Sequence, residues 1–386
     1  MQELSTLPKQ SIQEEALEAH KIVRGKLAIA PKVHLKEMKD LSIYYTPGVA
    51  AVSSHLALHK DEIKDYTMKH NTVAVVSDGS AVLGLGNIGP EGALPVMEGK
   101  ALIFKEFANI DAFPICLATQ DVDEIVKTVV NIAPVFGGIN LEDISAPRCF
   151  EVERRLKELL DIPVVHDDQH GTAVVVLAGL LNALKVVEKE LSLSRVVISG
   201  AGAAGNAIAH ILKAKGVGDV ILLDSKGILS KERNDLDSAK EELVLWTNKE
   251  NRVGGYEVAF LDTDVAIGVS KAGMFKSEYI KLMHENAIVF AMANPTPEIM
   301  PDEALAAGAR VVATGRSDFP NQVNNSLVFP GLFRGALDHN VKTVTEQMLV
   351  KAAENLAALV ENPTPQCIIP NAFDIRVVPA VASAIQ

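Results

Sequence analysis

The sequence predicts an α/β protein that combines a Rossmann-type, doubly wound parallel sheet domain with an N-terminal α/β substrate domain. Three observations support this prediction. Short apolar strands alternate with helical segments from residue 163 onward, a pattern typical of a parallel sheet. Strands upstream of residue 163 end instead in acidic or glycine-rich turns. A glycine-rich loop lies between one of the later strands and a helix, and it consists of Gly200, Ala201, Gly202, Ala203, Ala204 and Gly205.

The change of pattern near residues 161–170 predicts the domain boundary. We expect an N-terminal domain over residues 1–165 and a nucleotide-binding domain over residues 166–325. The remaining residues, 326–386, include a last helical segment at 341–360 that is followed by two prolines. This C-terminal segment can fold back onto the first domain and join it.

The elements follow from local patterns. Ser11 and Glu14 have the spacing of a capping box, which predicts a helix running toward Gly25. In the N-terminal part, apolar runs predict a helix at 122–132 and strands at 73–77, 101–104, 112–117 and 135–139. In the second part, they predict a helix from about residue 203 and strands at 195–199, 220–224, 265–269, 287–291 and 310–313.

The composition excludes several classes of protein. The chain has 386 residues and a net charge of −12, which argues against a nucleic-acid or anionic-membrane partner, since both need a basic surface. No apolar run approaches the ~18 residues of a membrane span, and the N-terminus lacks the apolar core of a secretory signal. The three cysteines are widely spaced and fit buried thiols in a reducing compartment better than disulfides. We therefore expect a cytoplasmic protein.

The glycine-rich loop predicts a dinucleotide site. Its first glycine makes the turn, its second admits the pyrophosphate and its third lets the helix pack on the strand. The next strand ends at Asp224, 19 residues after Gly205, where a carboxylate can accept hydrogen bonds from the ribose. Asp224 favours NAD because it repels a 2′-phosphate. Ser225 and Lys226 follow directly and could hold that phosphate, so NADP stays open.

Two pairs of acids end predicted strands. Glu142 and Asp143 form the first pair, and Asp167 and Asp168 lie between two histidines in the segment 166–170. Carboxylate oxygens suit Mg²⁺ or Mn²⁺, whereas the histidines leave a softer metal conceivable. The simpler alternative is that these acids are strand-end caps and solvated loop charges.

Lys100 and Tyr45 are candidate acid–base groups. A lysine next to a divalent cation should have its pKa lowered by charge repulsion, which makes it a usable base. Tyr45 precedes a Thr-Pro-Gly turn and could deliver a proton. Taken singly, each residue has a simpler explanation, a surface lysine and an interfacial tyrosine bonded to the backbone.

The chain resembles malic enzymes of the short bacterial and archaeal type. The likeness runs in the family's order over nearly the whole sequence and includes motifs far more specific than a glycine fingerprint. The matching segments are 45–50, 77–100, 141–143, 166–173, 200–205, 293–298 and 314–325.

The resemblance implies oxidative decarboxylation of (S)-malate to pyruvate and CO₂ with reduction of NAD, or NADP, and with oxaloacetate as a further substrate for decarboxylation. It implies a homodimer or higher oligomer and leaves open whether Tyr45 serves its own or its partner's site. The implied roles are general base for Lys100, general acid for Tyr45, Mg²⁺ or Mn²⁺ ligands for Glu142, Asp143 and Asp168, an acid beside these ligands for Asp167, cofactor contacts for 201–204 and Asn294, and a substrate contact for Asn324.

Two departures from the family are visible. The larger eukaryotic relatives carry a substrate-binding arginine where this chain has Ala81, so the holder of the substrate carboxylate is open. Some bacterial members carry a long acetyltransferase-like extension, and we expect no regulation through one here. The competing functions are a malolactic-type enzyme that converts malate to lactate, a 2-hydroxy-acid dehydrogenase without decarboxylation, and a non-catalytic NAD-binding sensor.

Overall fold

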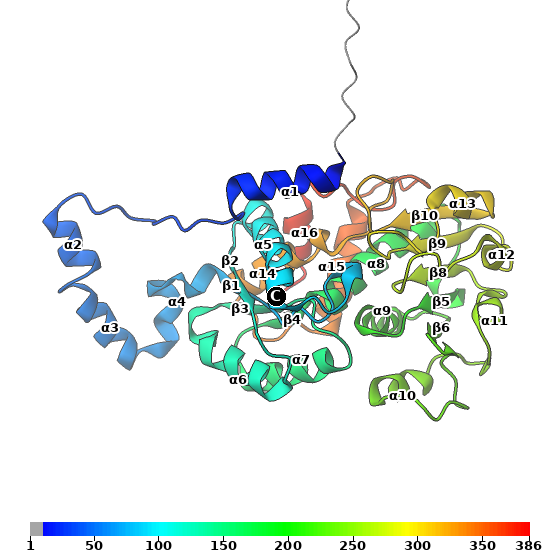
Figure 1. Cartoon of the computed structure of the whole chain (residues 1–386), viewed down its shortest axis with the longest axis horizontal. Coiled ribbons are helices and arrows are strands. Elements are labelled where there is room, and N and C mark those ends of the chain that lie inside the picture. The colour runs from blue at the N-terminus through cyan, green and yellow to red at the C-terminus, as the bar shows by residue number, and fades with distance from the viewer. Residues whose placement is uncertain (1–10) are drawn as a thin grey trace, which may run out of the picture.

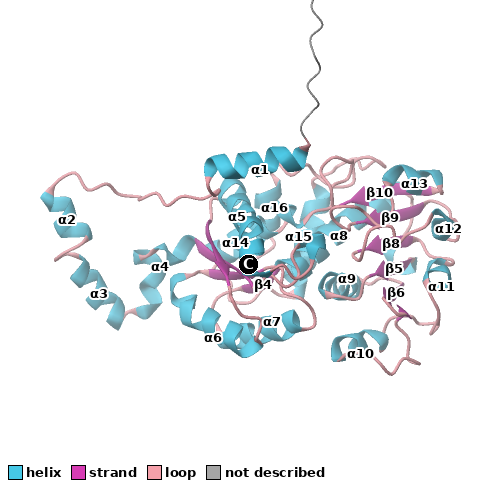
Figure 2. Ribbon diagram, in the orientation of Figure 1, coloured by secondary structure: helices cyan, strands magenta, loops and turns pink. Residues whose placement is uncertain are grey.

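The computed structural model describes residues 11–386 and contains two sheets side by side (Figures 1 and 2). The first sheet has the order β2-β1-β3-β4, and all its neighbouring strands are parallel. Its strands are β1 (Thr72–Ser77), β2 (Asp111–Cys116), β3 (Gly138–Leu141) and β4 (Val164–His166).

The second sheet has the order β10-β9-β8-β5-β6-β7 and is parallel except for β7, which forms an antiparallel pair with β6. This is the doubly wound sheet that the strand–helix alternation predicts, and the α/β fold class is confirmed. Its strands are β5 (Arg195–Ser199), β6 (Asp219–Asp224), β7 (Gly227–Ile228), β8 (Val265–Gly268), β9 (Ala287–Ala291) and β10 (Ala309–Thr314).

Helices cover both faces of the first sheet. The helices α6 (Val122–Ile132) and α7 (Arg148–Leu159) pack on one face, where Ile125, Val129 and Val152 belong to its core. The other face is covered by α5 (Gly89–Ala108) and by α14 (Phe329–Asp338), a helix from the far end of the chain. The C-terminal segment therefore contributes directly to the core of the first sheet.

The strand predicted at 101–104 is wrong, because these residues lie inside the 20-residue helix α5. The buried side chains of α5 recur at helical spacing, with Met97, Ala101, Phe104 and Ala108 on the inner face. The short window 101–104 shows only a run of apolar residues, and such a run does not distinguish a strand from a buried helix. Lys100 consequently lies in the middle of this helix rather than before a strand.

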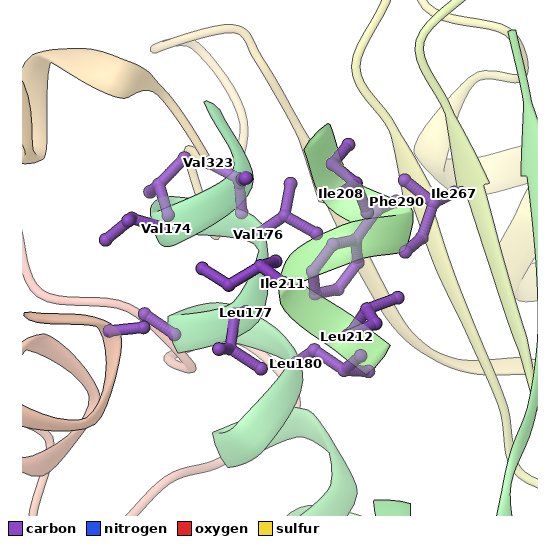
Figure 3. Close-up of a cluster of buried hydrophobic side chains, with 14 of the residues drawn as sticks. Val174, Val176, Leu177, Leu180, Ile208, Ile211, Leu212, Ile267, Phe290 and Val323 are labelled. Carbon is purple, nitrogen blue, oxygen red and sulfur yellow. The ribbon is translucent and has the colours of Figure 1, made fainter. Parts of the chain in front are cut away.

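The second sheet is covered on one face by α8 (Asp167–Val186), α9 (Ala203–Ala214) and α15 (Glu346–Ala358). Figure 3 shows the packing of α8 on α9, with Leu177 and Leu180 facing Ile211 and Leu212. The other face packs against α11 (Tyr256–Phe260), α12 (Ser277–Ile280) and α13 (Pro301–Ala306), while α10 (Ser238–Val244) lies next to α9.

Helix α8 is long and apolar enough to cross a membrane, but 72% of its most apolar window is buried inside the protein. It is thus packed as a core helix. The last helix, α16 (Val377–Ala382), packs on α14 and α15. Of the three cysteines only Cys149 is buried, so the expectation of three buried thiols is wrong for the exposed Cys367.

The N-terminal helices form an arm. The capping box of Ser11 and Glu14 is confirmed at the start of α1 (Ile12–Val23). After α1, an extended segment leads to the helices α2 (Met38–Tyr44), α3 (Val49–Leu58) and α4 (Ile63–Tyr66), and α2 and α3 project away from both sheets (Figure 1). Within the described residues 11–71, no side chain is buried. This segment therefore has no core of its own.

Candidate active site

Lys100 points from α5 into a buried set of acids. Its Nζ lies 2.7 Å from Oδ2 of Asp167 and 2.9 Å from Oε1 of Glu142, and it stands 4.3 Å from the centre of the Phe329 ring. Only 8% of the lysine is exposed. Three elements therefore meet at one ammonium group: the middle of α5, the end of β3 and the first residue of α8.

The carboxylates predicted to bind a metal are brought together. Ligand oxygens of Glu142, Asp143 and Asp168 lie within 4.8 Å of one another, and these three residues form the one such cluster that the described residues contain. The backbone N–H of Asp143 donates to Asp168 at 2.8 Å, and Asn140 donates to Oε2 of Glu142 at 2.9 Å. Asp143 has φ 54°, and its backbone carbonyl accepts a hydrogen bond from the N–H of Ala81 at 2.9 Å.

Burial sets the charge states of these acids. It raises the pKa of Glu142 and of Asp168, and it raises the pKa of Asp167 to about 7, in each case against the opposing effect of Lys100. Burial also acts to lower the pKa of Lys100, but the charges of Asp167 and Glu142 outweigh it and raise that pKa. The lowering expected from the sequence therefore requires the charge of a cation and does not come from these side chains.

The cluster fits a hard divalent cation. It offers only carboxylate oxygens, the donors that Mg²⁺ and Mn²⁺ prefer, and the raised pKa values reflect buried negative charge that a cation would neutralise. Neither neighbouring histidine belongs to the cluster, which disfavours a softer metal. His170 instead bonds through Nε2 to Oε1 of Glu153 at 2.8 Å, and His166 is wholly buried.

Sequence reasoning missed Glu153 on α7. Its buried carboxylate accepts hydrogen bonds from the backbone N–H of His166 and from the ring of His170, and it pairs with Lys157 at 2.8 Å. Burial acts to raise the pKa of Glu153, but His170 and Lys157 hold it well below its usual range. Glu153 thereby fixes the turn from β4 into α8 that presents Asp167 and Asp168. Nothing in its local sequence, a charged amphipathic helix, marks it out.

Arg148 is a second residue that the sequence did not single out. Its guanidinium donates to Oδ2 of Asp78 at 3.0 Å and to the hydroxyl of Ser145 at 3.1 Å. The backbone N–H of Ser145 in turn donates to Ser80 at 2.9 Å. These contacts connect the loop that carries Ala81 to the loop that carries the metal-site acids.

The glycine-rich loop has the form of a dinucleotide cradle. Gly200 follows β5, Gly202 caps α9, and a Cβ at Gly205 would lie 1.7 Å from the carbonyl oxygen of Gly200. At Gly202 a Cβ would meet nothing within 4 Å, so its backbone faces open space. The third glycine is thus required by packing, and the second leaves the helix N-terminus accessible to a phosphate.

The two asparagines lie where loops of the two sheets approach each other. A Cβ on Gly84 would come within 2.0 Å of the backbone oxygen of Asn294. The loop that follows β1 and contains Gly84 therefore touches the loop after β9. The side chain of Asn324 accepts a hydrogen bond from the N–H of Ser326 at 2.9 Å. The next residue, Asn325, lies beside Gly171 in the first turns of α8.

Tyr45 is the predicted site residue that the single chain does not bring to the others. It is the C-cap residue that follows α2 on the projecting arm, and 65% of it is exposed. Figure 1 shows α2 far from β4 and α5, the elements beside the acidic cluster. Within one chain, therefore, Lys100 and the three carboxylates converge without the tyrosine.

Comparison with known proteins agrees with this geometry. The family model for the malic enzyme N-terminal domain matches residues 24–157, and that for the malic enzyme NAD-binding domain matches residues 169–386. The chain belongs to the malic enzyme family. This malic enzyme is 54% identical over 378 residues to the bifunctional malic/malolactic enzyme of Bacillus subtilis (strain 168), covering 97% of this chain and 92% of that protein.

Two further relatives extend the comparison. The NAD-dependent malic enzyme of Geobacillus stearothermophilus is 53% identical over 365 residues, which cover 94% of this chain and 76% of that protein. The crystal structure of the NAD-dependent malic enzyme of Thermotoga maritima superposes with a TM-score of 0.93 at 50% identity, covering 96% of this chain and 98% of that chain. The family resemblance read from the sequence is thus confirmed.

Proposed function

We propose that this malic enzyme oxidises (S)-malate with NAD(P) and releases pyruvate and CO₂, with a divalent cation held by Glu142, Asp143 and Asp168. The convergence of a buried lysine with this carboxylate cluster carries the proposal, since Glu142 belongs to the cluster and lies 2.9 Å from Lys100. A sensor that only binds NAD would not need a buried ammonium group beside a metal site. A cation bound there would act as a Lewis acid on the oxygens of the substrate.

The side chains then have separate tasks. Lys100 takes the proton from the 2-hydroxyl as hydride leaves C2 for the nicotinamide, and Asp167 holds the lysine in position at 2.7 Å. The C4 carboxylate departs as CO₂, and Tyr45 protonates C3 of the resulting enolate. Asn294 and Asn324 contact the cofactor and the substrate as neutral amides. A neutral partner avoids stabilising the ground-state carboxylate more than the transition state.

We propose further that the enzyme is a homodimer or a higher homo-oligomer in which Tyr45 enters the site of the partner subunit. Two observations support this arrangement, the exposed apolar surface of the arm and an apolar groove beside α5. The arm that carries Tyr45 exposes apolar residues with no core to cover them, among them Ile29, Met38, Ile43 and Leu58. Such surfaces are typical of interfaces between subunits.

A groove of about 530 Å³ offers a place for the partner's arm. It lies between α5 and the segment 372–378 and is lined mainly by apolar side chains, including Leu102, Ile103 and Phe373. Lys100 lies on the same helix, α5, one turn or less from this lining. An arm seated here would lie beside the helix that carries the lysine.

Product analysis tests the proposed reaction. We expect that (S)-malate, NAD or NADP, and Mn²⁺ or Mg²⁺ give pyruvate, CO₂ and reduced nicotinamide in equal amounts. The relation to a bifunctional malic/malolactic enzyme makes malolactic conversion the second candidate. It would give lactate without accumulation of reduced cofactor. Oxaloacetate as the end product, without CO₂, would contradict both reactions.

Asp168→Ala tests the metal site. We expect the Mn²⁺ concentration for half-maximal activity to rise by at least about tenfold. Mutation of a residue that only hydrogen-bonds to a metal ligand already costs about tenfold to hundredfold in metal affinity or activity. Mn²⁺ titration calorimetry without substrate gives a readout that does not depend on turnover. Asp161→Ala is the matched control, because the side chain of Asp161 is 92% exposed. An unchanged Mn²⁺ titration for Asp168→Ala would remove this residue from the ligands.

We propose the domain division of residues 1–165 together with 326–386 as the substrate unit and 166–325 as the nucleotide unit. The return of α14 to the first sheet supports it, although α15 packs on α8 and α9. The burial of α8 supports a soluble enzyme, and we propose a cytoplasmic location.

A further inference from the structure

A group of charged side chains surrounds Asp224 at the end of β6. The guanidinium of Arg233 contacts both oxygens of Asp224, at 2.7 and 3.1 Å, and Nζ of Lys240 lies 3.3 Å from Oδ2. Arg233 also forms two contacts with Asp235, at 2.8 and 2.9 Å, and Lys226 pairs with Asp235 at 2.6 Å. These contacts form one continuous network at the predicted ribose position.

The hydrogen-bonding capacity of Asp224 is largely used by the protein. Its Oδ1 accepts from the backbone N–H of Lys226 and from Arg233, and its Oδ2 accepts from Arg233 and from Lys240. A carboxylate offers about four acceptor positions, so little capacity remains for the two ribose hydroxyls. The cations also act against burial and hold the pKa of Asp224 below its usual value, so it stays ionised and paired.

Pairing changes what the acid does to a nucleotide. In a Rossmann site an unpaired acid at this position binds the ribose 2′-hydroxyl, whereas a nearby arginine accommodates a 2′-phosphate. Here one arginine neutralises the acid. Four of its five N–H groups are directed to Asp224 and Asp235, which leaves one on Nη1 for a ligand. Only 14% of its side chain is exposed, so its fork is held in position. The neutralised acid repels a phosphate less, and the remaining N–H can donate one charge-assisted hydrogen bond to it.

We propose that Arg233 decides the cofactor preference of this enzyme, because its pairing with Asp224 lets the ribose site accept a 2′-phosphate, so that both NADP and NAD bind. This inference rests on the proposed placement of the adenosine ribose at Asp224. It assigns Arg233 to the 2′-phosphate of NADP and leaves Asp224 to limit how tightly that phosphate is held.

Direct cofactor binding tests the inference. Dissociation constants for NAD and NADP are measured by calorimetry, without malate, on the wild type and on Arg233→Ala, Asp224→Ser and Arg252→Ala. We expect Arg233→Ala to weaken NADP by about tenfold to hundredfold, the scale of a charge-assisted hydrogen bond, and to change NAD by less than about threefold. Asp224→Ser should tighten NADP, because it removes a negative charge beside the phosphate, and should change NAD by less than about threefold.

Arg252 provides the matched control. Its side chain is also 14% exposed and pairs with Glu250, which in turn pairs with Arg195 at the start of β5. Arg252→Ala should therefore leave both constants unchanged, and retained NAD binding by Arg233→Ala shows that this variant is folded. Arg233→Lys, which keeps the charge without the fork, should lie between the wild type and the alanine variant.

The remaining outcomes distinguish a failure of the role of Arg233 from a failure of the proposed function. Equal losses for both cofactors in Arg233→Ala, or no loss for NADP, would remove Arg233 from the 2′-position while the nucleotide site stands. A wild type that binds NAD but not NADP would do the same. A wild type that binds neither cofactor would contradict the proposed function as well.

Discussion

Lys100→Ala is expected to lower kcat for malate oxidation by at least about 100-fold, the usual scale for losing a general acid–base group. Lys100 is the proposed base, and its ammonium lies between Asp167 and the proposed metal ligand Glu142. Initial rates at saturating malate, cofactor and Mn²⁺ measure the effect. Near-normal turnover would remove the lysine from the role of base.

The alanine variant also leaves buried acids without their cation, which can destabilise the fold by about 3–5 kcal/mol. Lys100→Arg separates chemistry from stability. Its guanidinium keeps the positive charge but cannot be deprotonated in a protein, so we expect a folded and equally inactive enzyme. Lys105→Ala is the control on the same helix, because that lysine is half exposed and pairs with Asp111 on the surface. It should retain normal activity.

A purified heterodimer of Tyr45→Phe and Lys100→Ala chains is expected to regain about half of the wild-type activity, since a two-fold symmetric dimer with exchanged arms contains one intact site. Each parent homodimer should be at least about 100-fold impaired. The arm position of Tyr45, remote from Lys100 in its own chain, is the reason for this expectation. Differently tagged, coexpressed chains allow the mixed dimer to be isolated and assayed.

The reciprocal heterodimer gives the opposite result. A wild-type chain paired with the double variant Tyr45→Phe/Lys100→Ala contains no complete site if the tyrosine acts in the partner, but one complete site if it acts in its own chain. We therefore expect activity only in the first mixture. Activity in the second mixture alone would place Tyr45 in its own subunit's site. Activity in both mixtures would remove Tyr45 as the acid, because each mixed dimer contains one chain with an intact Lys100.

The fold of the nucleotide-binding part could be predicted from the sequence because its sequence patterns are local. The loop from Gly200 to Gly205 needs glycine at 200 for its φ of 111° and at 205 for packing against the carbonyl of Gly200, and the structure places it between β5 and α9 as predicted. The same holds for the strands of the second sheet, which are short apolar runs bounded by turns. A helix capping box at Ser11 is equally local and was equally readable.

The failures came where local sequence is ambiguous. The window 101–104 is apolar in a strand and in a buried helix alike, and only the surrounding helical spacing from Met97 to Ala108 distinguishes them. Glu153 looks like any surface acid of an amphipathic helix until the fold turns it toward His166 and His170. Arg233 likewise lies nine residues beyond Asp224 in a loop without regular structure.

The sequence alone thus determined the fold class, the family and the candidates for the chemically active side chains, because residue type and short spacing carry that information. Tertiary structure decided which of them meet. Lys100 joins Asp167 and Glu142 because a helix and two strand ends, far apart in the chain, are packed around one core. Tyr45 stays on an exposed arm, because the packing of one chain leaves α2 far from the elements that carry the acids.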